Sequence, residues 1–184
     1  MKFVRQHIPE VVLIEPEMHG DDRGYFIETF RQDLFEKAIG YRVNFVQDNQ
    51  SKSVKGVLRG LHYQLPPFSQ AKLVRVVEGR VLDVAVDMRK SSPSFGQHVA
   101  AELTAQNKHQ LFVPHGFAHG FVVLSESATF AYKVDNYYAP EHDRGIAFDD
   151  DKLGIDWKFP LAELRLSDKD KTHPSLGAAK DFFE

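Results

Sequence analysis

The 184-residue sequence predicts a mostly β protein, a sandwich or barrel of short strands with a few short helices. Alternating apolar or β-branched runs recur at roughly even spacing, and segments rich in Gly, Pro, Ser and Asn separate them. Because no linker, repeat or low-complexity tract interrupts this pattern, residues 1–184 are predicted to form one domain. We expect strands at residues 11–14, 25–30, 44–47, 57–64, 72–77, 81–88, 98–103, 119–124 and 129–134.

Helical signals are confined to one stretch near the N-terminus and to the end of the chain. In RQDLFEKAIG (31–40), apolar residues recur at 34, 35, 38 and 39, and Gly40 is a typical helix terminator. We therefore expect one short helix there. The tail after Asp149 mixes apolar and polar residues, and we expect short helices in it.

Composition and charge exclude several classes of protein. Hydrophobic residues make up 42% of the chain and charged residues 27%, as is typical of a soluble globular protein. The net charge of −3 gives no global basic field for nucleic acid, and no apolar run reaches the roughly 18–20 residues of a membrane span. The first residues lack the apolar segment of a signal peptide. The absence of cysteine excludes disulfides and thiolate catalysis, and together with the missing signal peptide it indicates a cytoplasmic protein. From the net charge and the lengths of the apolar runs, we expect that the protein binds neither nucleic acid nor membrane.

The segment 72–87 indicates a hairpin with its turn at 78–80, and the faces of its second strand differ in character. One face is entirely large and apolar, whereas the other carries Asp83 among small residues. In the first strand, Lys72 shares a face with valines. Small β-barrels can enclose one ligand, and Lys72 and Asp83 would suit such an interior. The alternation leaves a second interpretation open, in which both residues lie on the wet outer face of the sheet.

Two of the nine histidines, His62 and His119, lie in apolar strand-like runs. In FVPHGFAHGFVVL (112–124), the spacing Pro-x-Gly-x-x-His resembles the second motif of the cupin superfamily, whose fold is a double-stranded β-helix, the jelly-roll barrel. Metal-binding cupins also have a His-x-His pair, but here Gln64 takes the second position and the next ionisable residue is Lys72. Two imidazoles and an ammonium group make a poor site for a divalent metal, so no metal is expected.

Cationic and aromatic residues indicate a different ligand. Arg23, Arg59 and Lys72 lie beside glycines or apolar runs, and the planar guanidinium of Arg matches phosphate oxygens. Tyrosines gather in AYKVDNYYAPEHD (131–143), where they could stack on a flat ring. Together with a histidine base, these groups suit a nucleotide-linked small molecule. Each group also has an alternative role that involves no ligand. Arg23 could form an ion pair with a neighbouring aspartate and so close the turn, and the tyrosines could belong to the core.

The chain contains the segments GDDRGYFIETF, FVQDNQSKS, GVLRGLHYQ, AKLVRVVEGRVLDVAVDMRKSSPSFGQ, FVPHGFAHGF, YKVDNYY and LSDKD. In their order and spacing, the chain resembles the dTDP-4-dehydrorhamnose 3,5-epimerase family from about residue 8 to 174. The resemblance implies a cupin-fold homodimer that uses no metal or organic cofactor. It also implies epimerisation of dTDP-4-keto-6-deoxy-D-glucose at C3 and C5 to dTDP-4-keto-L-rhamnose, a step in dTDP-L-rhamnose biosynthesis for cell-surface polysaccharide.

The resemblance also implies roles for individual residues. His62 corresponds to the general base, Asp170 to its carboxylate partner, and Tyr132 to the general acid on the opposite face of the sugar. Lys72 corresponds to the cation that stabilises the enolate oxygen. Tyr138 corresponds to the residue that stacks on thymine. The resemblance implies contacts to nucleotide, diphosphate or sugar for Arg23, Phe26, Glu28, Gln47, Asp48, Asn49, Arg59, His119, Tyr138, Asp143 and Lys169.

Two departures and one alternative role are left open. Asp143 stands where family members often carry Glu, and Ala71 stands where Gly is usual. The shorter side chain leaves the role of residue 143 open. The pattern Ser167-x-x-Asp170 also fits a helix capping box, which is the alternative to a base-orienting role for Asp170.

Three other functions compete with double epimerisation. They are a C3-only epimerase of a related dTDP-4-keto sugar, a metal cupin such as a dioxygenase, and a non-catalytic cupin that binds sugar nucleotides. The last predicts that a catalytic residue is missing, yet His62, Lys72, Tyr132 and Asp170 are all present. The presence of Tyr132 favours inversion at both carbons, although the orientation of its ring decides.

The stretch GVLRGLHYQL (56–65) poses a geometric problem. Arg59 and His62 are three residues apart, so strict alternation sends their side chains to opposite faces of a strand. The implied function needs both near one ligand. We predict a bulge or kink at Gly60 that shifts the alternation. The alternative places Arg59 at the end of the strand, where it reaches the ligand around an edge or from the partner subunit.

Overall fold

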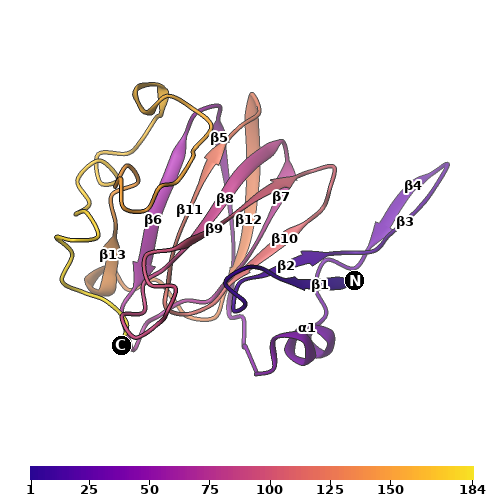
Figure 1. The fold of residues 1–184 in the computed structure, drawn as a ribbon. Coiled ribbons are helices and arrows are strands. Elements are labelled where there is room, and N and C mark those ends of the chain that lie inside the picture. The colour runs from indigo at the N-terminus through magenta and orange to yellow at the C-terminus, as the bar shows by residue number, and fades with distance from the viewer.

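Two antiparallel β-sheets packed face to face form the body of the protein, in a computed structural model that describes residues 1–184 (Figure 1). The six-stranded sheet contains, in spatial order, β1 (Lys2–Arg5), β2 (Val12–Glu15), β10 (Gln110–Val113), β7 (Lys72–Glu78), β12 (Ser127–Val134) and β5 (Gln47–Val54). The five-stranded sheet contains β13 (Asp143–Gly145), β6 (Leu58–Gln64), β11 (Phe117–Val123), β8 (Arg80–Asp87) and β9 (His98–Thr104). This arrangement confirms the predicted mostly β, double-sheet fold class.

A third, two-stranded element projects from the body. Strands β3 (Met18–Asp21) and β4 (Gly24–Ile27) pair only with each other, and Figure 1 shows this hairpin extending away from both sheets. Tyr25 and Phe26 in the hairpin are largely exposed. None of the helices has the length and apolar character that a membrane span requires.

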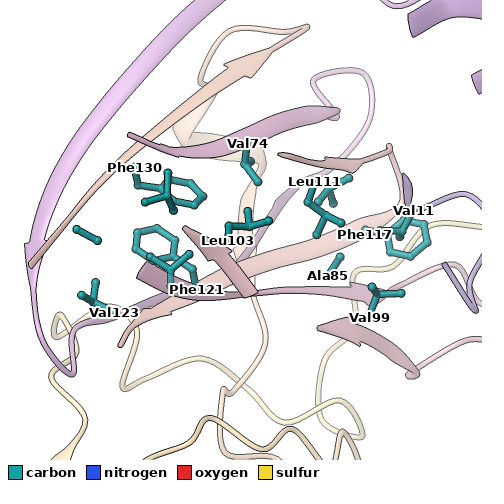
Figure 2. Close-up of a cluster of buried hydrophobic side chains, with 14 of the residues drawn as sticks. Val11, Val74, Ala85, Val99, Leu103, Leu111, Phe117, Phe121, Val123 and Phe130 are labelled. Atoms are coloured by element: carbon teal, nitrogen blue, oxygen red, sulfur yellow. The ribbon is translucent and has the colours of Figure 1, made fainter. Parts of the chain in front are cut away.

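The apolar core between the two sheets is built from strands of both (Figure 2). Val74 and Phe130 come from the six-stranded sheet, whereas Ala85 and Phe121 come from the five-stranded sheet. The rings of Phe121 and Phe130 stack across the gap, with centroids 4.1 Å apart and planes inclined by 16°. Burial of such side chains contributes about 1.5–3 kcal/mol each, so this core fixes the distance and orientation of the two sheets.

The outer faces are covered by other parts of the chain. The C-terminal segment, with Ile146 and Trp157 buried, packs on the outer face of the five-stranded sheet. Helix α1 (Gln32–Ile39) packs Phe35 on Phe112 of the six-stranded sheet, with ring centroids 5.0 Å apart. The helix predicted at 31–40 is thus confirmed. Gly40 ends it with φ 91°, and the backbone N–H of Gly40 donates to the carbonyl oxygen of Glu36. The remaining helical turns are two short 3₁₀ turns, η1 (Pro140–His142) and η2 (Leu161–Glu163).

The strand predictions failed where the sequence lacks apolar alternation. The strand expected at 44–47 was wrong, because β5 begins only at Gln47, and its sequence QDNQSKSV is polar except for Val54. It forms because it pairs along its whole length with β12 at the edge of the sheet, so its backbone hydrogen bonds do not depend on burial of apolar side chains. The strand expected at 25–30 ends at Ile27. The short strands β1, β3, β10 and β13 were not predicted.

The hairpin expected at 72–87 was wrong. Strands β7 and β8 belong to different sheets, and the chain crosses between them at Gly79, which has φ 81°. A Cβ atom at Gly79 would lie 2.0 Å from the carbonyl oxygen of Ser127, so only glycine allows this close crossing. Asp83 faces inward with Val81 and Ala85 and is fully buried. The interpretation of Asp83 as part of a polar interior is therefore the correct one.

A bulge in β6 resolves the problem of Arg59 and His62. In the pairing of β6 with β11, His62 lies opposite His119 and Arg59 opposite Phe121, so three steps on β6 match two on β11. The extra residue confirms the irregularity predicted at Gly60 and brings both side chains to the same face. Gly60 has φ 131°, and a Cβ atom there would lie 2.6 Å from Cα of Gly120. The bulge therefore depends on two glycines in direct contact.

Gly60→Ala should destabilise the fold more than Gly24→Ala. Both glycines have φ 131°, a conformation that other residues rarely adopt, so both substitutions strain the backbone. A Cβ atom at Gly24 has nothing within 4 Å, whereas at Gly60 it meets backbone that cannot move aside. We expect the free energy of unfolding from urea titrations to fall by roughly 1–3 kcal/mol more for Gly60→Ala, the usual cost of overpacking. Equal losses in the two variants would contradict this account of the bulge.

Candidate active site

A cavity of about 480 Å³ lies between the two sheets, beyond the end of the apolar core. Its walls come from both sheets and from the C-terminal segment: Ser51, Val57, Leu58, Arg59, His62, Lys72, His119, Phe121, Tyr132, Arg165, Leu166, Ser167, Lys169 and Asp170. A smaller hollow of about 210 Å³ shares His62, Lys72, Tyr132 and Lys169 with it and extends to Tyr138 and Asp143. We call the two together the central cavity.

His62 and Asp170 form a close pair on one wall of the central cavity. Nε2 of His62 donates to Oδ1 of Asp170 at 2.5 Å, which leaves Nδ1 free to accept a proton. His62 belongs to β6, and Asp170, only 4% exposed, belongs to the C-terminal segment. The backbone N–H of Asp170 also donates to Oγ of Ser167 at 3.2 Å, so the capping contact exists alongside the carboxylate–imidazole bond.

The surroundings of this pair keep the imidazole neutral. Burial lowers the pKa of His62, and although Asp170 opposes that effect, the charges of Lys72 and Lys169 add to it. Burial alone would raise the pKa of Asp170, but contacts from His173 and His62 outweigh it and hold that pKa well below its usual range. At neutral pH the pair is therefore a neutral imidazole beside a carboxylate, which is the state that a general base requires.

The facing wall carries Tyr132 on β12 and Lys72 on β7, both from the six-stranded sheet. Burial raises the pKa of Tyr132, so its phenol stays protonated and can donate. Burial lowers the pKa of Lys72 to about 8, despite the opposing charges of Asp143 and Asp83. Lys72 is thus a cation at neutral pH, held in a poorly solvated place where its charge acts strongly.

His119 lies on the same wall as His62 and is held by a buried carboxylate. Its Nε2 lies 3.1 and 3.0 Å from the two oxygens of Asp83, which is fully buried. This bond fixes the orientation of the ring and leaves Nδ1 as its remaining polar atom. Because His119 pairs with His62 across β11 and β6, the two imidazoles form one polar strip.

One end of the central cavity is aromatic and ionic. Tyr138 is largely exposed, and its hydroxyl donates to Oδ2 of Asp143 at 2.9 Å. Lys169 forms an ion pair with the same oxygen. An exposed tyrosine ring held by its hydroxyl offers a flat surface on which a base could stack. The shorter Asp143, in place of the frequent Glu, still reaches both partners.

The opposite end of the central cavity is cationic. Arg59 donates from Nε to Oγ of Ser53 at 3.1 Å, and Arg165 from the C-terminal segment lines the same end. Arg59 therefore lies on the other side of His62 from Tyr138. No sequence pattern had indicated Arg165.

Six of the residues implied to bind substrate do not line the central cavity: Arg23, Phe26, Glu28, Gln47, Asp48 and Asn49. Arg23 and Phe26 belong to the projecting hairpin, and Glu28 follows it. Arg23 pairs with Asp21 at 2.5 Å, as the alternative interpretation of this turn predicted, but its side chain is 89% exposed. Figure 1 shows the hairpin on the far side of the six-stranded sheet from β6.

The segment Gln47–Asn49 lies in the edge strand β5 and divides between two faces. Gln47 and Asn49 share a face with Ser51 and are joined by a hydrogen bond of 2.7 Å. Asp48 points to the outer face, where it forms an ion pair with Lys133 at 2.8 Å. The structure therefore does not bring the Asp48 side chain into the central cavity.

Several cavity residues could not be found from sequence patterns. Ser51 lies in a polar strand, and Phe121 in a run that resembles core. Arg165 lies in the tail, where no periodicity exists. His173, which lies beside Asp170 and does not line the cavity, belongs to the same tail. Asp83, which holds His119 and does not itself line the cavity, was found because the alternation along its strand marked it as a polar residue among small ones.

His62, Asp170 and His173 form a group whose possible ligand atoms lie within 4.8 Å of one another. The donor set is a poor match for a divalent metal, because the ammonium charges of Lys72 and Lys169 act on His62 and oppose a further cation. The bond between His62 and Asp170 also occupies two of the three ligands.

Comparison with known proteins gives a consistent result. The family model described as dTDP-4-dehydrorhamnose 3,5-epimerase matches residues 5–178. A dTDP-4-dehydrorhamnose 3,5-epimerase from Shigella flexneri is 55% identical over 170 residues, which cover 92% of this chain and 93% of the relative. One from Pseudomonas aeruginosa is 53% identical over 182 residues, covering 99% of both. A dTDP-6-deoxy-D-glucose-3,5-epimerase from Legionella pneumophila, solved in complex with dTDP-4-keto-L-rhamnose, is 48% identical with a TM-score of 0.91, covering 96% of this chain and 93% of that one.

Proposed function

The chain belongs to the dTDP-4-dehydrorhamnose 3,5-epimerase family, and we propose that it performs this reaction with a base and an acid from the two facing sheets. It is an isomerase that converts dTDP-4-keto-6-deoxy-D-glucose to dTDP-4-keto-L-rhamnose by inversion at C3 and C5. The observation that carries the mechanism is the location of His62 on one wall of the central cavity and Tyr132 on the other.

The substrate supplies its own means of activation. The 4-keto group acidifies the protons on C3 and C5, so removal of either gives an enolate. Return of a proton to the other face inverts the carbon. The enzyme therefore needs a base on one face, an acid on the opposite face and a positive charge at the enolate oxygen. No cofactor is needed for this chemistry.

His62 is the base in this proposal. Nδ1 is its free nitrogen, and its lowered pKa leaves it unprotonated at neutral pH. Asp170 fixes the tautomer and stabilises the imidazolium that forms when the proton arrives. The role of Asp170 depends on this bond and not on contact with the sugar.

Tyr132 and Lys72 act from the other wall. The phenol of Tyr132 stays protonated because burial raises its pKa, and it can deliver a proton to the face opposite His62. Lys72 supplies the positive charge for the enolate oxygen. Because its pKa is lowered to about 8, this charge is lost as the pH rises above that value in the free enzyme.

The nucleotide is assigned to the end of the central cavity that carries Tyr138. Stacking of thymine on Tyr138 places the diphosphate near Lys169 and the sugar between His62 and Tyr132. His119 then lies beside the sugar. Arg59, at the other end of the central cavity, contacts the far edge of the sugar or an extended diphosphate.

The alternatives are less well supported. The matching family model and the relatives that are 55% and 53% identical are 3,5-epimerases, whereas a 3'-monoepimerase from Streptomyces bikiniensis is only 35% identical. The Legionella protein was solved with dTDP-4-keto-L-rhamnose, in which both carbons are inverted. These findings favour double inversion over a C3-only epimerase and over a non-catalytic binding protein. We place the reaction in the cytoplasm and its product in the synthesis of cell-surface polysaccharide.

The location of the hairpin supports a homodimer. Arg23, Phe26 and Glu28 correspond to residues that bind substrate, yet in one chain they lie far from His62. An exposed hairpin with Tyr25 and Phe26 on its surface suits insertion beside the cavity of a second copy. We propose that each subunit supplies these residues to the nucleotide site of its partner, where Phe26 covers the base that stacks on Tyr138.

Solvent deuterium tests the reaction and the two opposed roles. In deuterated water with dTDP-4-keto-6-deoxy-D-glucose, the wild-type enzyme should incorporate deuterium at both C3 and C5, as located by NMR. Tyr132→Phe should exchange hydrogen at C3 with little inverted product, because His62 can return a deuteron to the face it came from. His62→Asn should lose both exchange and inversion by about 10²–10⁴-fold.

Tyr137→Phe is the matched control, since Tyr137 is exposed and does not line the central cavity. It should behave as wild type. Deuterium confined to C3 in the wild-type product would show a C3-only epimerase. Double inversion by Tyr132→Phe at nearly the wild-type rate would remove Tyr132 from the role of acid.

Mixed dimers test the contribution of the partner subunit. Arg23→Ala should weaken binding of the dTDP-sugar by about 1.5–3 kcal/mol, which is what a charge-assisted hydrogen bond contributes. His62→Asn should bind the dTDP-sugar but be inactive. A dimer with one chain of each kind contains one intact site, because Arg23 comes from one chain and His62 from the other. Co-expression with two different tags should therefore restore activity.

The control pair is His62→Asn with Tyr132→Phe. Both residues belong to one chain's cavity, so neither site of that mixed dimer is intact and activity should not return. Failure of the first pair to exceed this control, or a monomeric enzyme in solution, would contradict the exchange of hairpins.

A further inference from the structure

His173 lies beside the proposed base with its Nε2 atom buried, but it has no part in the reaction described above. Its side chain is 9% exposed, and its Nε2 has no hydrogen-bond partner. That nitrogen lies 3.6 Å from Oδ1 of Asp170, the same oxygen that accepts from His62 at 2.5 Å. One carboxylate oxygen therefore faces two imidazoles.

The chain is built to hold the His173 ring in this place. A Cβ atom at Gly145 would lie 2.4 Å from both Cε1 and Nε2 of that ring, so glycine is required for the ring to fit. Gly145 in β13 is the register partner of His62 in β6. The rings of His62 and His173 meet edge to face, with centroids 5.4 Å apart and planes inclined by 79°. The sheet thus fixes His173 relative to the base itself.

A buried nitrogen without a partner is costly, and such groups in native proteins call for an explanation. If Nε2 carries the proton, the Asp170 oxygen is the acceptor that it faces. A movement of about half an ångström, within ordinary fluctuation, converts the 3.6 Å approach into a hydrogen bond. The contact is therefore available whenever the carboxylate shifts as His62 gains or loses a proton.

We propose that His173 is a positioning residue, whose Nε2–H is directed at Oδ1 of Asp170 and restrains that carboxylate beside His62. The inference rests on the proposed role of His62 as the base. A second donor on Oδ1 withdraws part of the negative charge that Asp170 would otherwise direct at the imidazolium. His62 then releases its proton more readily and is restored for the second inversion.

The sign of the effect on His62 follows from the groups that face it. Removal of the donor at 173 leaves the full charge of Asp170 to act on the imidazolium, so the pKa of His62 should rise. The other groups are unchanged by such a substitution. The charged and titratable groups that face His62 are Lys72 from β7, His119 from β11, Tyr132 from β12, Asp143 from β13, and Lys169, Asp170 and His173 from the C-terminal segment.

The test compares His173→Met with His173→Gln. These two side chains have nearly the same volume and flexibility, but only Gln keeps an N–H donor near the position of Nε2. We expect the pKa of His62, from NMR titration of its imidazole, to rise by about 0.5–1 unit in the Met variant. We expect kcat to fall about tenfold, as when outer partners of functional groups are removed, with KM nearly unchanged. The Gln variant should have a His62 pKa, a kcat and a KM that are all close to those of the wild type.

Thr172→Val is the control for the local turn, because it removes the bond from Oγ1 of Thr172 to the carbonyl oxygen of Lys169 without touching Asp170. It should leave the titration of His62 unchanged. Equal behaviour of the Met and Gln variants, including unfolding of both, would show that His173 acts through packing and would overturn the proposal. A shift in Thr172→Val equal to that of the Met variant would do the same.

The titration also separates this inference from the proposed function. An inactive wild-type enzyme with a His62 shift in the Met variant would refute the epimerase mechanism and leave the contact intact. An active wild-type enzyme with no such shift would refute the positioning role alone.

Discussion

The packing of two antiparallel sheets across one apolar core is the constraint on which the site depends. Phe121 and Phe130 stack between the sheets, and at the end of that core the walls carry polar groups instead of apolar ones. Because strands β6 and β12 belong to opposite sheets, His62 and Tyr132 face a common space from two sides. Inversion of a carbon needs just this opposition of a base and an acid, so the chemistry follows from the architecture.

The charges in the central cavity are held by partners that lie behind them. Asp83 fixes His119, and Asp170 fixes His62, so the buried carboxylates are paired rather than free. Asp170 depends in turn on the C-terminal segment, which packs Trp157 and Leu153 on the outer face of the five-stranded sheet. The tail has little regular structure of its own, yet its packing places the residue that orients the base. Loss of that packing would disable His62 without any change in β6.

Sequence patterns predicted the features that depend on local alternation. The strands around His62, Asp83 and His119 were found because their apolar residues alternate, and the bulge at Gly60 followed from the need to bring Arg59 and His62 together. Strand β5 was missed because it is held by pairing at an edge and not by burial.

Long-range relations could not be predicted from the sequence. The crossing between sheets at Gly79 looks like a hairpin turn until the partner strands are known. The contact of Asp170 with His62 spans 108 residues, and the family resemblance, not periodicity, pointed to it. Neither source indicated His173 or Arg165, since the tail that carries them has no pattern to interpret.

A crystal structure of His62→Asn with dTDP-4-keto-6-deoxy-D-glucose tests the central claim most directly, because this variant should bind the substrate without turning it over. The account predicts a sugar ring between the two sheets, with residue 62 on one face and the Tyr132 hydroxyl on the other. Each should lie about 3–3.5 Å from the reacting groups at C3 or C5, with the ketone oxygen at Lys72. A sugar bound with both residues on the same face, or outside the central cavity, would contradict the account.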